Sequence, residues 1–545
     1  AGPWRHSAVM DKDDVIRHCR PMQARSFLTA LAAALLSLVL VTTGLLWGLE
    51  RRSPLRLVDQ PLQLPRAARF VPRDAALSVH WLADSARLPA YAQAVAPPRQ
   101  RRAARDGMRQ WRDGAFALAG LDFDAELASW VGPDLSLTLL DASDTPGWVL
   151  ALTSTDSDGA RRFLQRFWQT RSLAGTDLQI SSYRGMGLIS GRGALVGRDP
   201  QPLATALIDD DLVLLASGRG VLERALDVSQ LQQQHQLGDE QLGRDIAELD
   251  HGMALITASP DALRRWFELP SALSGLEGMV AALQADNADL LVEGRLRWQE
   301  RIDAAPWTVQ QDLVGGSGGR ASLMAQLQDP SRLLDPDELH PLAQWLGPFL
   351  KRHLAQQPAA LALLELDEGP LLLQQQPEGW LLATSHSQPE LSAVDDQLKA
   401  QGLAQSDLSG DGESIQVWTR LKRQRGRSAG VEASLAVARS ADSDRDWWGE
   451  TLPSLVQRQD SRALEPRLQQ WRNLSNHQSN PAQSLMLASK PARTVLADWQ
   501  PWTLLQAMAG QTLQPRIQGL SLSLEADRQD EGRSVLPLHA RLELG

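Results

Sequence analysis

Residue types that often carry chemistry are scarce in this chain. It has one cysteine, Cys19, and its ten histidines are scattered so that no two have the H-x3-H spacing of a metal site. A single cysteine excludes an intramolecular disulfide and a cysteine metal cluster. The sequence therefore predicts no catalytic, cofactor-binding or metal-binding residues.

Positive charge is also in deficit. The chain has 55 Lys and Arg against 65 Asp and Glu, and residues 1–52 account for seven and four of these. The remaining 48 basic and 61 acidic residues give residues 53–545 a net charge of −13. Proteins that bind nucleic acid neutralise its phosphates with a basic face. We therefore expect no nucleic-acid partner.

Formal charge is missing altogether from one long apolar run, which begins at Phe27 and ends at Leu49. As a helix, its 23 residues reach roughly 34 Å, enough for a hydrocarbon core of about 30 Å. A signal peptide has a shorter apolar region and a small-residue cleavage site, and a buried soluble helix rarely lacks a polar face for so long. We predict a transmembrane anchor from Phe27 to Leu49 in contact with the lipid bilayer, after a short tail at residues 1–26.

The flanking charges do not orient this anchor, because five basic residues precede it and five follow it by residue 69. Long domains translocate largely regardless of charge. A short basic lead before an apolar segment is typical of an uncleaved signal anchor, so we expect the C-terminal region to be exported. Both Met10 and Met22 fit a start of the chain, and Met22 begins a compact basic lead.

The region after the anchor alternates strand and helix patterns. Residues 50–73 contain four prolines and predict an extended tether. Strands are expected at 76–81, 134–140, 147–154, 178–183, 186–190, 203–208, 212–216, 253–258 and 289–298. Helices are expected at 100–118, 157–173 and 260–267.

Several short patterns recur later in the chain in the same order. Leu82-Ala-Asp84 returns as Leu327-Gln-Asp329, residues 135–140 resemble 361–366, and residues 147–152 resemble 379–384, at offsets of 245, 226 and 232. On this basis a twelve-residue hairpin loop is expected at 367–378. We predict a tandem duplication of an α+β unit with mainly antiparallel sheets, the copies being residues 74–314 and 320–545.

The junction between these units, residues 315–319, reads GGSGG and formally matches the G-x-S-x-G pattern of a nucleophile elbow. A strand rather than a helix is expected after it, so a flexible Gly/Ser linker is the better interpretation. Acidic runs at 209–211, 407–413 and 442–446 are read as polar turns, because position 418, where a calcium loop starting at Asp407 would need Glu, is tryptophan.

Tryptophan is the abundant aromatic residue, with 18 copies against two tyrosines. Trp148 and Trp380 occupy equivalent strand positions and are expected to pack between sheet and helices. Trp447 and Trp448, at an expected helix start beside an acidic run, are the candidate exposed contact with a partner.

Five segments carry a family resemblance, at residues 22–27, 68–73, 95–102, 153–164 and 173–178. On these, the chain from Met22 onward resembles the cyanobacterial proteins grouped as domain-of-unknown-function family 3352. The resemblance implies a single-pass protein of the plasma or thylakoid membrane with its soluble region in the periplasm or lumen. It implies no catalytic or ligand residues.

Two classes of function stay open. The first is a non-enzymatic interaction or scaffold protein that contacts a membrane or lumenal protein, and it predicts an apolar or aromatic surface patch. The alternative is an envelope hydrolase or a small-ligand-binding protein with its site between the repeats. That alternative predicts that His251, His340 or His386 meets carboxylates and that their pKa values are perturbed. No cofactor is implied by either class.

Overall fold

The computed structural model describes residues 53–545 except for 58–60, 119, 144–145, 174–176, 194–200, 250, 267–274, 303, 306, 308–312, 387–388, 411–412, 424–430, 476–480, 500–501, 504–505, 507–513 and 531. Residues 57–545 form one compact unit. Among the described residues, no helix has both the length and the apolar character needed to span a bilayer. The anchor predicted at 27–49 lies outside the described residues.

The elements up to Trp298 are called the first half below. In chain order they are η1 (Arg66–Phe70), β1 (Leu77–Trp81), α2 (Leu88–Val95), α3 (Arg101–Leu118), η2 (Phe123–Leu127), β2 (Val131–Leu139), β3 (Trp148–Ser154), α4 (Ser157–Leu173), β4 (Gln179–Tyr183), β5 (Met186–Gly193), β6 (Gln201–Ile208), β7 (Leu212–Ala216), α5 (Arg219–Val228), η3 (Gln236–Gly238), α6 (Glu240–Ala247), β8 (Ala254–Ala258), α7 (Pro260–Trp266), β9 (Leu276–Asp286) and β10 (Asp289–Trp298). These elements confirm the strands and helices predicted for residues 76–298.

The elements from Leu323 onward are called the second half. They are β11 (Leu323–Gln328), α8 (Pro330–Leu334), α9 (Pro341–His353), α10 (Pro358–Leu366), β12 (Pro370–Gln376), β13 (Gly379–Ser385), α11 (Leu391–Ala400), β14 (Leu403–Gly410), β15 (Glu413–Arg423), β16 (Val431–Ala441), β17 (Arg445–Gly449), α12 (Leu452–Gln457), α13 (Ser461–Ser475), β18 (Pro481–Ala488), α14 (Ser489–Asp498), η4 (Gln514–Arg516), β19 (Ile517–Glu525), β20 (Arg528–Asp530) and β21 (Arg533–Leu544).

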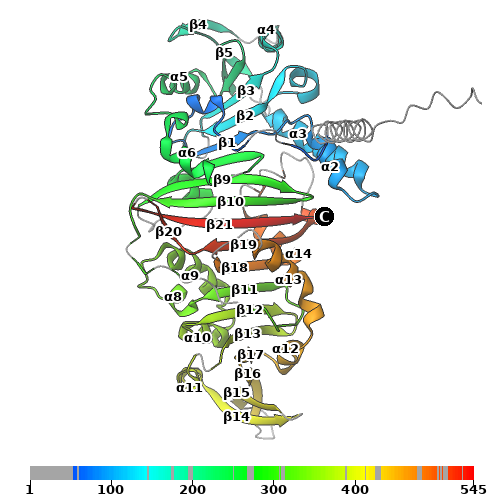
Figure 1. Ribbon diagram of the computed structural model, residues 1–545, viewed down its shortest axis with the longest axis vertical. Helices are drawn as coiled ribbons and strands as arrows, with labels where there is room; N and C mark the ends of the chain where they lie inside the picture. Colours follow the sequence, from blue (N-terminus) through cyan, green and yellow to red (C-terminus); the bar gives the residue numbers. More distant parts are fainter. Residues whose placement is uncertain are drawn as a thin grey trace, which may run out of the picture. The chain divides into compact units, whose positions relative to one another are not determined.

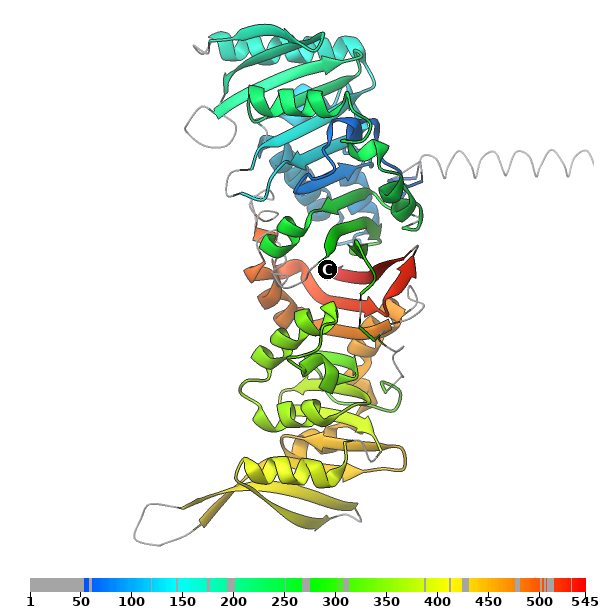
Figure 2. The same cartoon turned by 90° about the vertical axis from the view of Figure 1, so that its left-hand side faces the viewer.

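All described strands belong to one antiparallel sheet of 21 strands. Read inward from one edge, the first half runs β4-β5-β6-β7-β3-β2-β1-β8-β9-β10. Read inward from the other edge, the second half runs β14-β15-β16-β17-β13-β12-β11-β18-β19-β21. The two series meet where β10 pairs with β21, the red strand beside green β10 in Figures 1 and 2.

The pairing register is the same in both halves. In the first half, Val79 pairs with Ile256, Ile256 with Ala281, and Ala281 with Gly294. In the second half, Ala325 pairs with Leu485, Leu485 with Leu522, and Leu522 with Ala540. Residues 79 and 325 differ by 246 positions, and so do residues 294 and 540. The ladder joining β10 to β21 sets Glu293 opposite His539, which is also 246 positions later.

The helices pack on both faces of the sheet, because neighbouring strand residues point to opposite sides. On β11, Leu323, Ala325 and Leu327 belong to a core that also holds buried residues of α7 to α11 and α14, whereas Met324 belongs to the core under α12 and α13. In the first half, α4 and η2 cover one face and η1 and α5 the other. The mixed α+β class with antiparallel pairing is therefore confirmed.

Three sequence expectations are corrected. The tether predicted at 50–73 is not extended throughout, because Leu57, Leu62 and Val71 are buried and residues 66–70 form η1. Residues 361–366 belong to helix α10, whose first turn starts at Pro358; the strand equivalent to β2 is β12, inside the expected hairpin loop. Residues 315–319 are packed rather than flexible: a Cβ added to Gly318 would lie 2.5 Å from the Arg458 carbonyl oxygen.

Candidate functional site

Charged or ionisable side chains occupy alternate positions over part of each of the two strands that meet in the middle of the sheet. Since alternate residues of a strand share a face and Glu293 lies opposite His539, the two rows share one face. The set, called the central charged seam below, comprises Glu293, Arg295 and Arg297 on β10 and His539, Arg541 and Glu543 on β21.

Acidic residues from neighbouring elements pair with the arginines of the seam. Arg297 Nη1 lies 2.6 Å from Asp245 Oδ2 on α6, and the Asp245 side chain is 1% exposed. Arg295 forms an ion pair with Glu248, at the end of the same helix. Breaking a buried pair strands the remaining charge in a poorly solvated place. These contacts therefore fix α6 on the sheet.

On β21, Arg541 likewise pairs with acidic residues of neighbouring elements. Its Nη2 lies 2.6 Å from Asp289 Oδ2, and its Nη1 lies 3.0 Å from Asp286 Oδ2. Glu543 accepts a 2.7 Å hydrogen bond from the Gln470 amide on α13. Burial raises the pKa of Glu543, and this hydrogen bond only partly opposes the effect. The seam thus holds the β9–β10 turn and α13 as well as α6.

His539 sits between two carboxylates at the centre of the seam. Its Nε2 lies 3.2 Å from Glu525 Oε1 and its Nδ1 lies 3.7 Å from Glu293 Oε1. Glu525, 1% exposed, also pairs with Arg528. Burial opposes ionisation of Glu525, but the hydrogen bond with His539 and the charge of Arg528 outweigh it and lower the pKa of Glu525. The centre of the seam is therefore a compensated ionic cluster.

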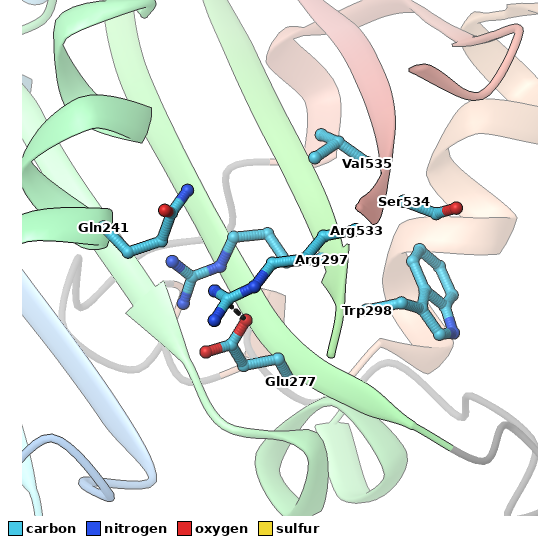
Figure 3. Close-up of a pocket in the computed structure, with 7 residues that line it drawn as sticks. All are labelled: Gln241, Glu277, Arg297, Trp298, Arg533, Ser534 and Val535. Atoms are coloured by element: carbon cyan, nitrogen blue, oxygen red, sulfur yellow. Dashed lines mark ion pairs between the residues drawn. The ribbon is translucent and has the colours of Figure 1, made fainter. Parts of the chain in front are cut away.

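Very little open space remains at the end of the seam. Figure 3 shows the cavity there, with Glu277 3.6 Å from Arg533 across it. Its lining residues are Gln241, Glu277, Arg297, Trp298, Arg533, Ser534 and Val535. The volume is about 10 Å³, which holds about one water molecule. The seam joins the two halves of the sheet, and the cavity at its end is too small for a substrate.

A larger hollow lies beside α6. Its volume is about 450 Å³, within the range of ligand and side-chain sites. The lining comes from three segments: residues 62–64, Gln232 with residues 237–239, and the α6 residues Glu240, Gly243, Ile246 and Ala247. Leu62 and Ile246 are buried at its base, and Leu237 is 42% exposed.

The rim of this hollow is polar and acidic. Gln63, Gln232 and Glu240 are exposed, and Asp239 is half-buried. The Asp239 carboxylate accepts hydrogen bonds from the backbone N–H groups of Gln241 and Leu242, which caps α6. An apolar base with a polar rim suits the docking of an apolar side chain from another chain. We call this feature the α6 hollow.

The histidines expected at an enzymatic site lie apart. Buried His340 accepts a 2.9 Å hydrogen bond at Nδ1 from the Trp307 indole, and its Nε2 lies 3.5 Å from Asp527. His386 Nδ1 lies 3.2 Å from Asp446, which also pairs with Arg439. The backbone of His251 contacts Leu249 and Gln284. In the described part of the chain these three histidines share no carboxylate.

One of these pairs perturbs an acid. Burial opposes ionisation of Asp527, but its hydrogen bonds with the His340 side chain and the Trp307 backbone N–H outweigh it, and the pKa of Asp527 is lowered. Trp307 and His340 hold this carboxylate against the helix start at Pro341. The contacts of Asp527 therefore hold the segment at Trp307 and the start of α9 in place.

The exposure predicted for Trp447 and Trp448 is wrong. Both lie on strand β17, not at a helix start, and they are 3% and 0% exposed. Pairing of β17 with β13 and β16 places their rings in the cores on opposite faces of the sheet. Neither ring offers a surface to a partner.

The acidic run at 209–211 forms the turn between β6 and β7, as predicted for a polar turn. Asp209 and Asp210 have positive φ angles of 47° and 64°. Arg66 lies 3.0 Å from Asp209 and 2.7 Å from Asp211, and Arg161 lies 2.6 Å from Asp210. Arginines thus neutralise all three carboxylates.

These features define a protein of the α+β class in which helices cover both faces of a single antiparallel sheet. The chain belongs to the family described as "Protein of unknown function (DUF3352)", which matches residues 30–539. This confirms the family resemblance read from the sequence.

No curated protein matches the chain. Solved structures that are similar to it include crystal forms I and III of TP0453, at 7% and 8% sequence identity. They cover 45% and 44% of this chain and 88% and 83% of their own, with TM-scores of 0.26 and 0.25. Scores of this size do not establish a shared fold.

Proposed function

We propose that this chain is a non-enzymatic, membrane-anchored interaction protein whose exported region binds another protein of a cyanobacterial envelope or thylakoid. The apolar run from Phe27 to Leu49 supports the anchor. The α6 hollow is the observation that carries the binding function. It combines a volume of about 450 Å³ with an apolar base and a polar rim.

We further propose that the soluble region arose by tandem duplication, with each half contributing ten strands of the same connectivity. Support comes from the repeated strand order and from the offset of 246 residues that recurs at β1/β11 and at β10/β21. Glu293 and His539 would then be equivalent residues facing each other on a pseudo-twofold axis. A junction formed by two copies of the same strand is what a fused dimer would contain.

A site between the two halves is the weaker alternative. The seam there is filled by ion pairs and leaves a cavity of about 10 Å³. The α6 hollow lies instead within the first half, on residues 62–64 and 232–247. We therefore place the partner contact on that hollow.

The test is an affinity purification of the full chain from its own membranes in a gentle detergent. Leu237→Arg places a charge in the hollow at an exposed position, and Leu231→Arg, at a residue that is 52% exposed and outside the lining, is the matched control. A partner in stoichiometric amount should stay with the wild type and the control. Its affinity for the Leu237 variant should fall by about tenfold or more.

Two results would contradict the proposal. Equal retention of the partner by both variants would show that the partner does not bind at the α6 hollow. A purified chain that carries no protein but turns over a small molecule would place it among enzymes.

A further inference from the structure

An uncompensated group of arginines stands out on this acidic chain. Arg99, Arg101 and Arg102 are exposed at the turn between α2 and α3 and in the first turn of α3. None of the three side chains has an ion-pair or hydrogen-bond partner within the described residues. Arg105, one turn further, pairs instead with Asp106 at 2.9 Å. We call Arg99, Arg101 and Arg102 the α2–α3 basic turn.

The stability of the helix does not explain these arginines. The first turn of α3 has no acidic residue, and cations near a helix N-terminus are unfavourable because the helix dipole is positive there. Elsewhere on the chain, exposed arginines are commonly paired, as Arg66 and Arg161 are with the β6–β7 turn. The basic turn therefore has the character of a surface that meets an anion outside the chain.

The position of the turn indicates which anion. Leu57 is buried in the cluster formed by Leu88 and Tyr91 of α2 and packed by Met108 and Trp111 of α3. Leu57 comes eight positions after Leu49, the end of the proposed anchor, so at most about 30 Å of extended chain separates them. From Met108 to Arg101 the helix rises only about 10 Å.

We propose that the α2–α3 basic turn binds the anionic lipid headgroups of the bilayer that holds the anchor. The inference rests on the proposed anchor for the nearness of the bilayer. Each arginine near an anionic surface contributes enough to strengthen binding roughly fivefold, so three give about a hundredfold. The contact would hold the α2–α3 end of the first half against the membrane.

The experiment uses the full chain, with Cys19→Ser, reconstituted into nanodiscs of neutral lipid or of neutral lipid with anionic phosphatidylglycerol. A fluorophore on Gln100→Cys reports closeness to lipids that carry a headgroup quencher, and a fluorophore on Ser182→Cys of edge strand β4 is the control site. Quenching at residue 100 should appear only with anionic lipid, weaken in high salt, and disappear when Arg99, Arg101 and Arg102 are changed to Gln. Residue 182 should stay unquenched.

Quenching at residue 100 that ignores lipid charge, or that survives the triple substitution, would overturn the lipid contact. So would an unquenched residue 100 in every bilayer. Resistance of the chain to carbonate extraction tests the anchor separately. Extraction of the chain by carbonate would show that the proposed anchor is wrong. Charge-dependent quenching with added anionic vesicles would still test whether the basic turn binds anionic lipid.

Discussion

Where the first half of the sheet carries His80, the equivalent ladder position of the second half carries Gln326, and both side chains are buried. His80 Nδ1 lies 2.8 Å from Ser136 Oγ, and its Nε2 lies 3.1 Å from Gln236 Oε1. The Gln236 amide also donates to Thr257 at 3.0 Å. An imidazole and an amide thus fill the same place, but only the imidazole can gain a charge.

The second half contains a buried acid, Asp367, whose pKa is shifted in the opposite direction to that of His80. Asp367, which follows α10 in the second half, is fully buried, and burial together with the nearby Asp329 and Glu368 charges raises its pKa to about 7. Burial lowers the pKa of His80 to about 4 despite its hydrogen bond with Gln236. The two halves should therefore respond to pH with opposite signs, although their strands are connected in the same way.

The largest difference expected between the halves comes from their equivalent tryptophans. Trp380, 1% exposed, fills the second-half core, whereas Trp148 is only half-buried. Trp380→Ala should lower the free energy of unfolding by about 3–5 kcal/mol, and Trp148→Ala by about 1–2 kcal/mol. Urea denaturation of the full chain in detergent, followed by circular dichroism, measures both; equal losses would show that the two cores are equally packed.

The next effect concerns Asp367. The folded chain binds its proton up to about pH 7, whereas the unfolded chain releases it near pH 3.8. The stability contributed by this proton is therefore complete below pH 3.8 and is lost as pH rises to 7, at up to about 1.4 kcal/mol per pH unit. Asp367→Asn should remove this slope and exceed the wild type in stability at pH 8. Denaturation midpoints from pH 4 to 8 measure it; parallel curves for the two proteins would contradict it.

The smallest effect concerns His80. Its folded pKa is about 4 against an ordinary 6.5, so its stabilising contribution is complete above pH 6.5 and is lost as pH falls toward 4. His80→Gln, which copies the residue of the second half, should flatten the curve in this range. At pH 7.5 its stability should stay within about 1 kcal/mol of the wild type. A variant that keeps the acid slope would assign that slope to another group.

Local sequence patterns predicted most elements but not all of them. The amphipathic run at 157–173 matches helix α4, because its apolar residues face one side. The run at 361–366 resembles a strand because it is apolar except for Glu365, and so short an apolar run has no period to distinguish helix from strand. Trp447 and Trp448 were misplaced for a related reason: the acidic run before them resembles a helix start but forms the β16–β17 turn.

The sites could be predicted less well than the fold. The charges at alternate positions from Glu293 to Arg297 on β10 were a signal for the central charged seam, since a buried row of charges must be neutralised. Their partners, such as Asp245 and Glu248, lie on α6 and follow no local pattern. The α6 hollow combines residues near position 62 with residues near 237 and 246, so only the folded chain brings them together.

The position of β21 also determines when the sheet can be completed. This strand, at residues 533–544, pairs with both β10 and β19, so among the described strands it alone connects the two series in the ladder. Pairing with β10 closes a loop of more than 200 residues, a slow step compared with local hairpin formation. Until β21 has been synthesised, the two series are separate pieces, each with an unpaired edge. A chaperone that shields exposed strand edges would therefore be needed most before β21 pairs with β10.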